Sequence, residues 1–257
     1  MIVMHTLFAL WSASPPAQQV PVAERPRDPW FFRCVLDEKP RSLTIALSRE
    51  MWVAYDAQTC SFTKAWKGGV HFAGAVYDSV HGPQPTSFGE AYLRGIPGNV
   101  WTARVGGQEV PVRAQWLGFH DKHGRVHMNY RMFLPDGRHI GVQETPEFIS
   151  SESVLPEEAM LEFGLVEGAP GFFRSYAVDS IPDGVFLSLH VAMDGATFVM
   201  PYPPDQLQRE SMSEEVDANG VRVTKRSAYL PFGLHRLKAN LALFFDPLPD
   251  ANEPLPR

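Results

Sequence analysis

The strongest constraint on this chain is the alternation of apolar and polar residues in short segments that end at turn signals. Residues 125–133 (RVHMNYRMF) alternate in this way, and a Pro-Asp-Gly turn at 135–137 precedes a similar segment at 139–143. A period of two predicts a strand with one buried face. The predicted inward side chains of the first segment are Val126, Met128, Tyr130 and Met132.

About a dozen such segments follow one another with almost no helical periodicity, which predicts an all-β fold. We expect an antiparallel β-sandwich with little helix, resembling a supersandwich. No linker interrupts residues 100–245, so one domain over residues 30–247 is expected. Individual predictions are strands at 42–48, 160–167 and 185–191, a hairpin at Asn219-Gly220, a short helix or polar loop at 204–215, and a long loop at 68–98.

Composition excludes some function classes. The chain has 257 residues, 44% of them hydrophobic, which is enough to bury a sizeable core. The net charge of -6, with no long basic run, argues against a general nucleic-acid binder.

The N-terminus predicts export. Residues 1–17 contain an apolar run of about ten residues followed by small residues, which is typical of a signal peptide. An ordinary N-terminal strand is the alternative, because the run is preceded by no Lys or Arg. A proline-rich tether is expected at 18–29 and a loose tail at 248–257, with a periplasmic or secreted mature protein and no transmembrane segment.

Two cysteines bear on the compartment. In an oxidising environment Cys34 and Cys60 can pair, which would stabilise the fold by roughly 3–4 kcal/mol. Two buried free thiols are the alternative. We expect the disulfide if the protein is exported.

An aromatic and basic cluster precedes and enters the predicted 68–98 loop. Aromatic rings pack against the apolar face of a pyranose, and flanking polar groups bond its hydroxyls, so this cluster predicts a sugar platform. Burial of the rings in the sandwich core is the alternative. The predicted platform consists of Trp52, Tyr55, Lys64, Trp66, Lys67, His71 and Tyr77.

A second candidate site lies on the polar side of residues 125–133. His127 is expected to face Glu144 on the next strand, where the two could act as acid and base on a sugar. Asn129 and Arg131 would bind the ligand there, with His81 from the loop as a third catalytic group. An exposed polar face is the alternative. The histidines match no zinc signature, and neither a metal nor another cofactor is predicted.

Two stretches carry a resemblance to known proteins. DPWFFRCVLDEKPRSLTIAL and MWVAYDAQTCSFTKAWKGGV resemble an exported bacterial module found in multidomain proteins with c-type cytochrome and sugar-dehydrogenase-like domains. YRMFLPDGRHIGVQETPEF is similar to strand pairs of galactose-mutarotase-like supersandwiches. The first resemblance implies no activity of its own, and the second implies carbohydrate handling.

Three functions follow from these features. The first is an exported carbohydrate-recognition or accessory β-sandwich. The second is a carbohydrate-active enzyme of the mutarotase, epimerase or lyase type that uses His127, Glu144 and His81. The third is a docking module for a periplasmic c-type cytochrome or dehydrogenase, with the 68–98 loop as its contact surface.

Overall fold

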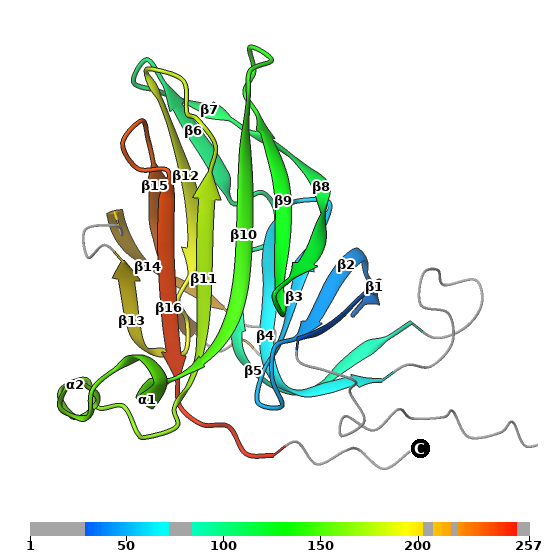
Figure 1. The fold of residues 1–257 in the computed structure, drawn as a ribbon, viewed down its shortest axis with the longest axis vertical. Coiled ribbons are helices and arrows are strands. Elements are labelled where there is room, and N and C mark those ends of the chain that lie inside the picture. Colours follow the sequence, from blue (N-terminus) through cyan, green and yellow to red (C-terminus); the bar gives the residue numbers. More distant parts are fainter. Residues whose placement is uncertain (1–28, 72–83, 203–207, 217–219, 221, 251–257) are drawn as a thin grey trace, which may run out of the picture.

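The computed structural model describes residues 29–71, 84–202, 208–216, 220 and 222–250. The predicted signal peptide, nearly all of the tether and most of the tail lie outside these residues. The described chain forms three antiparallel sheets, with two short helices at one end (Figure 1). The predicted all-β antiparallel sandwich is therefore confirmed.

The first sheet contains five strands in sequence order, β1-β2-β3-β4-β5. Its central strand β3 is short and buried on both faces, because apolar residues occupy consecutive positions. The strands are β1 (Trp30–Leu36), β2 (Lys39–Ala46), β3 (Trp52–Asp56), β4 (Ser61–His71) and β5 (Thr86–Arg94).

The second sheet has six strands in the order β13-β16-β11-β10-β9-β8. Strand β9 alternates between buried and half-buried residues as predicted, with Val126, Met128, Tyr130 and Met132 inward. The strands are β8 (Arg113–Lys122), β9 (Arg125–Phe133), β10 (His139–Ser150), β11 (Pro170–Val178), β13 (Ala196–Tyr202) and β16 (Lys238–Phe245).

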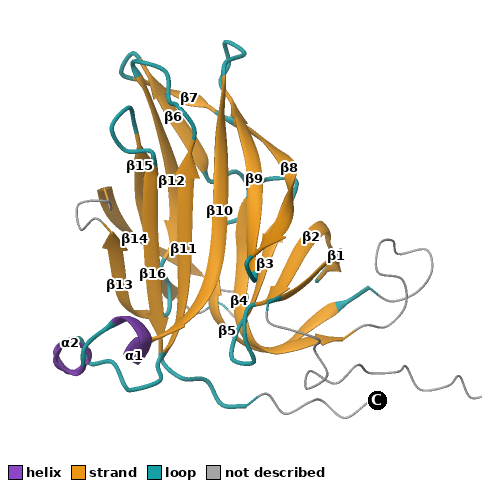
Figure 2. Ribbon diagram, viewed as in Figure 1, coloured by secondary structure: helices purple, strands orange, loops and turns teal. Residues whose placement is uncertain are grey.

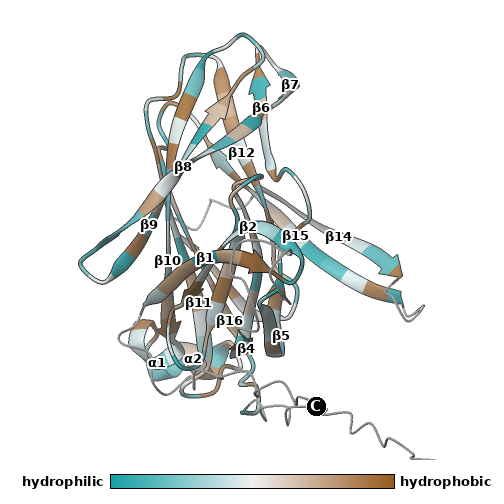
Figure 3. Cartoon of the chain, turned by 90° about the vertical axis from the view of Figure 1, so that its right-hand side faces the viewer, coloured by the Kyte–Doolittle hydropathy of each residue, from teal (hydrophilic) through white to brown (hydrophobic). Residues whose placement is uncertain are grey.

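The third sheet has the order β14-β15-β12-β6-β7. Its β14–β15 hairpin extends away from the body as a two-stranded ribbon (Figure 3). Val216 pairs with Arg222 across this hairpin, which confirms the hairpin predicted at Asn219-Gly220. The strands are β6 (Trp101–Val105), β7 (Gln108–Pro111), β12 (Val185–Ala192), β14 (Gln208–Val216) and β15 (Arg222–Phe232).

One hydrophobic core joins the three sheets. It contains Leu43 from the first sheet, Met128 from the second and Leu187 from the third, all fully buried. A smaller cluster lies on the other face of the first sheet, and another lies under the helices. Because each sheet contributes to the main core, side chains from distant parts of the sequence meet there.

The two helices, α1 (Ser151–Val154) and α2 (Glu157–Glu162), lie together where β10 ends (Figure 2). The prediction of a strand at 160–167 is wrong. Residues 157–162 (EEAMLE) are good helix formers that follow Pro156, and acidic residues in a first turn favour the helix dipole. Met160 anchors α2 against Phe244 of β16.

Two other local predictions are also wrong. Residues 208–216 form strand β14 rather than part of a helix or polar loop. The predicted 68–98 loop contains the end of β4 and all of β5, because Gly68 and Gly89 face each other across the hairpin. Both have positive φ, 140° and 96°, and an added Cβ at Gly68 would meet the Phe88 carbonyl. Glycine thus continues this ladder rather than ending it.

Candidate functional site

The tryptophan rings of the predicted sugar platform are not exposed at the surface. Trp52 and Trp66 are fully buried, and their rings stack with centroids 5.9 Å apart. The Trp66 indole N–H donates to the Gly69 carbonyl, 3.1 Å away. The prediction that these rings are exposed is therefore wrong, because neighbouring strands β3 and β4 both bury their aromatic residues. Tyr77 lies outside the described residues.

The lysines of the predicted platform bond to the protein itself. Lys64 donates to the Ser87 hydroxyl at 2.5 Å, and burial lowers its pKa although Asp37 partly offsets this. Lys67 pairs with Glu50 at 2.8 Å and with Asp250 at 2.9 Å. These two cations tie strand β4 to other segments.

His71 ends strand β4, and its ring lies 4.3 Å from the Phe88 ring centroid. His81, the third predicted catalytic group, lies outside the described residues.

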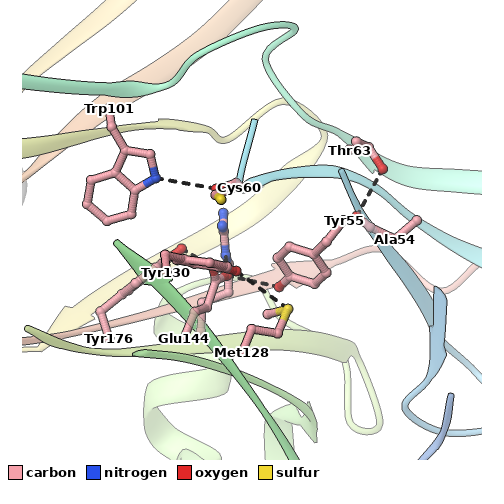
Figure 4. Close-up of polar contacts among 10 residues, drawn as sticks. Ala54, Tyr55, Cys60, Thr63, Trp101, Met128, Tyr130, Glu144 and Tyr176 are labelled. Carbon is pink, nitrogen blue, oxygen red and sulfur yellow. Dashed lines mark hydrogen bonds and ion pairs between the residues drawn. The ribbon is translucent and has the colours of Figure 1, made fainter. Parts of the chain in front are cut away.

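A charged cluster lies inside the main core around Glu144 (Figure 4). Its Oε1 accepts hydrogen bonds from Tyr55 at 2.9 Å, Arg174 Nε at 2.8 Å and Tyr176 at 3.0 Å. Its Oε2 accepts one from Tyr130 at 3.0 Å. Strands β3, β9, β10 and β11 each supply a member, so the cluster links the first sheet to the second.

Aromatic rings surround the guanidinium of this cluster. The Arg174 guanidinium carbon lies 5.0 Å from the Phe62 ring centroid and 5.7 Å from that of Phe172. Ring faces attract a cation, which compensates in part for its removal from water. Burial is the largest single effect on the pKa of Arg174 and lowers it, but the Glu144 carboxylate, Tyr176 and Tyr55 together outweigh burial and raise the pKa.

The tyrosines of the cluster are held in their protonated form. Burial, and next the Glu144 carboxylate, raise the pKa of Tyr55 and Tyr130 well above the usual range. Burial likewise raises the pKa of Tyr176, with Arg174 opposing and Glu144 reinforcing the change. The three hydroxyls therefore stay protonated near neutral pH and, with Arg174, are the four donors to the Glu144 carboxylate.

Only part of this cluster was expected from the sequence. Tyr55 and Glu144 were candidates for separate sites, whereas Tyr130 was predicted only as a core residue, and Arg174 and Tyr176 were missed. A usable signal existed, since Arg174 occupies an inward position of β11 in an otherwise apolar alternation. A charged residue at such a position requires a buried partner.

The predicted pairing of His127 with Glu144 is not found. Glu144 is 1% exposed and faces the core, whereas His127 is half-buried on the opposite face of the same sheet. His127 lies beside Thr145 instead, with Nδ1 2.8 Å from the Thr145 hydroxyl. The strand register places Met128, not His127, opposite Glu144. Because side chains alternate between the two faces of a sheet, His127 and Glu144 point to opposite faces.

The outer face of the second sheet carries a row of neutral hydrogen-bonding side chains. Strand register aligns His120 with His127, Thr145 with Ser175, and Ser175 with Asn240. With strands about 4.8 Å apart, a row over five strands is about 19 Å long. The outer row, as we call it, consists of His120, His127, Thr145, Ser175 and Asn240.

Neighbouring side chains extend the outer row. The imidazoles of His120 and His127 stack with centroids 5.1 Å apart. Asn129 lies 3.3 Å from His120 Nδ1 and accepts a hydrogen bond from Gln143 at 3.2 Å. Burial, and next the nearby His120, lower the pKa of His127. Both effects favour an uncharged imidazole near neutral pH. Arg131 lies one step further along β9, on the same face.

The cysteines do not pair. Cys34 belongs to the cluster with Trp52, whereas Cys60 belongs to the main core on the other face of the first sheet. The predicted disulfide is therefore wrong, and both residues are buried free thiols. Burial raises the pKa of Cys34 to about 11 and that of Cys60 to about 12, so neither is a ready thiolate.

The described part of the chain contains neither a metal-binding cluster nor a membrane-spanning helix. No group of three or more His, Cys, Asp or Glu side chains there is arranged to hold a metal ion. No helix there has the length and hydropathy needed to cross a membrane.

Comparison with known proteins identifies no relative of this chain. No protein-family model matches the chain, and neither a curated protein nor a solved structure is significantly similar to it.

Proposed function

We propose that this protein is an exported carbohydrate-recognition β-sandwich without catalysis of its own, and that the outer row binds the ligand. The observation that carries the proposal is the alignment of His120, His127, Thr145, Ser175 and Asn240 across one sheet face. Export rests on the N-terminal apolar run. Asn129, Gln143 and Arg131 flank the row and belong to the same surface.

The chemistry of the row suits a neutral polyol. Hydroxyl, carboxamide and uncharged imidazole groups both donate and accept hydrogen bonds, as sugar hydroxyls do. The row itself contains no Lys, Arg, Asp or Glu, so a charged ligand would find no partner within it. Hydrogen bonding to neutral hydroxyls along the row therefore favours an uncharged, extended saccharide.

The rigidity of the row supports recognition over catalysis. Its members stand on adjacent strands of an antiparallel sheet and contact one another, for example His127 with Thr145. Sites on regular elements are held more rigidly than sites on loops, and this reduces the entropy lost on binding. The nearest buried carboxylate, Glu144, faces the other side of the sheet. The acid and base that the enzyme hypothesis needs are therefore not brought together by the outer row.

A glycan array probed with the full chain tests the proposal. We expect binding to uncharged oligosaccharides, and the best ligand is then measured by calorimetry. The Thr145→Ala/Ser175→Ala double variant should bind at least about tenfold more weakly, because two hydrogen bonds at the centre of the row are lost. Ser188→Ala is the matched control, since Ser188 is a half-buried serine on the outer face of the third sheet.

Three results would contradict the proposal. The first is the absence of binding to any neutral saccharide on the array. The second is equal weakening by Ser188→Ala and by the double variant. The third is turnover of the bound saccharide that survives Thr145→Ala/Ser175→Ala, which would move the activity to another surface.

A further inference from the structure

The helical corner of the molecule exposes apolar side chains. This corner, comprising residues 151–169, contains α1, α2 and the segment that leads to β11 (Figure 2). Leu161 is 74% exposed, Val166 54% and Val154 43%. Three exposed aliphatic side chains therefore lie within 13 residues of the chain at one corner of the fold, and grouped exposed apolar side chains mark interaction sites.

The corner is held firmly to the sheet beneath it. Met160 and Leu165 are buried against Phe244. The Ser151 hydroxyl donates to the Val166 carbonyl at 2.8 Å, and the Gly168 N–H donates to Glu152 at 2.9 Å. The exposed aliphatic residues therefore belong to a segment that is fixed to the sheet by Met160, Leu165 and these hydrogen bonds.

The charge of the corner is of one sign. Residues 151–169 contain five Glu and no Lys, Arg or His. The whole chain has 23 basic and 29 acidic residues, so removing these five leaves 23 against 24, a net charge of -1 instead of -6. Four of these glutamates are exposed and form no ion pair with another described residue: Glu157, Glu158, Glu162 and Glu167.

We propose that this corner is a docking surface for another protein whose contact face has an apolar centre ringed by Lys and Arg. Leu161, Val166 and Val154 would meet the apolar centre, and the glutamates would pair with the ring. A charge-depleted core within a polar rim is the usual anatomy of a protein interface. Opposite charge on the rim speeds association and selects the partner.

Charge argues against two other occupants. A second copy of this chain would bring ten glutamates together without a counter-charge. An anionic membrane surface would repel the corner for the same reason.

The test uses a fluorescent synthetic amphipathic helix, with Leu on one face and Lys on the other, titrated with the full chain. A second peptide, with every Leu replaced by Ser, keeps the charge and loses the apolar face. We expect the Leu peptide to bind more tightly than the Ser peptide. Leu161→Ser/Val166→Ser and Glu157→Gln/Glu158→Gln/Glu162→Gln should each weaken its binding about tenfold or more, and added salt should weaken it further.

Matched controls sit elsewhere on the chain. Leu234 is 53% exposed, and Glu214 and Glu215 are exposed on β14, so Leu234→Ser and Glu214→Gln/Glu215→Gln should leave binding within about twofold. Thermal unfolding of each variant verifies folding, and Leu161→Gln alone replaces the double variant if that one unfolds.

Four results would overturn the proposal. They are equal binding of the two peptides, unchanged binding by both corner variants, self-association in sedimentation that Leu161→Ser abolishes, and binding to phosphatidylcholine vesicles that depends on Leu161. The third would assign the corner to a second copy of the chain, and the fourth to a lipid surface.

Discussion

The β9–β10 hairpin carries polar groups on both of its faces, but those on the inner face are buried and those on the outer face are partly exposed to solvent. On the inner face Glu144 is 1% exposed and accepts from four donors. On the outer face, one residue along, Thr145 is half-buried and bonds His127 in a row that borders solvent. Inside, the carboxylate is bonded to four donors of the same cluster, and we expect this cluster to stabilise the fold. Outside, the side chains border solvent, where the proposed saccharide would bind.

The comparison explains why a carboxylate and an imidazole that are close in sequence do not form one site. Adjacent residues on a strand point to opposite faces, so only residues of equal parity meet. Glu144 is opposite Met128, so both side chains point into the core. His127 is adjacent to Met128 on β9 and therefore points to the outer face. Two polar side chains on neighbouring strands can therefore form one site only when both point to the same face of the sheet.

The largest expected effect comes from breaking the buried ion pair. Arg174→Met leaves Glu144 buried without its cation, and we expect a loss of about 3–5 kcal/mol in the free energy of unfolding. Urea denaturation measures it. The Glu144→Leu/Arg174→Met double variant should be more stable than the single variant, because no unpaired charge remains. A loss below about 1 kcal/mol for Arg174→Met would contradict the view that the inner cluster stabilises the fold.

The tyrosines give a finer test within the inner cluster. Tyr130 is the one described donor to Oε2 of Glu144, whereas Oε1 has three. Tyr130→Phe should therefore cost more than Tyr176→Phe, within the range of about 1.5–3 kcal/mol for hydrogen bonds to a charged group. Urea denaturation of both variants at neutral pH measures the difference. The opposite order would mean that Oε2 has another donor or bonds to water.

The outer face should respond to acid through His127. Burial and His120 lower the pKa of folded His127, so the unfolded chain binds its proton at a higher pH than the folded chain does. Stability should therefore fall as pH drops below the ordinary histidine value of about 6.5, and continue to fall until the lowered folded pKa is reached.

His127→Gln tests this expectation, because it should make the decline below pH about 6.5 shallower. His190 contributes in the same direction, since burial also lowers its pKa, and His190→Gln serves as the comparison. Urea denaturation at a series of pH values reports both. A decline identical in the wild type and in His127→Gln would show that the imidazole is not desolvated at this position.

The fold was predictable from the sequence to the extent that alternation decides the face of each residue. Strand β9 and the β14–β15 hairpin followed from period two and from Asn219-Gly220. Strands β3 and β4 were harder, because the burial of Trp52 and Trp66 depends on what packs over the sheet. The helical corner was missed because residues 160–167 are apolar at spacings that suit either element, and Pro156 decides the matter by starting a helix.

The candidate site was less predictable than the fold, for a physical reason. Its members come from strands that are distant in sequence, and register alone determines which of them align. The placement of Ser175 beside Thr145, and of Asn240 beside Ser175, depends on the pairing of β11 with β10 and β16. No local pattern carries that information. On the inner face Arg174 was missed as well, although a charged residue at an inward position of β11 is a signal for a buried partner.

The smallest effect on stability is expected on the outer row, and it separates the two faces of the hairpin most sharply. Thr145→Ala/Ser175→Ala removes two half-buried hydroxyls that no buried charge needs, so each should change the free energy of unfolding by no more than about 0.5 kcal/mol. The same double variant should weaken saccharide binding by at least about tenfold. Urea denaturation and calorimetry on one preparation measure both quantities. A loss of several kcal/mol would mean that the outer row, like the cluster around Glu144, supports the fold, and the contrast between the two faces would then disappear.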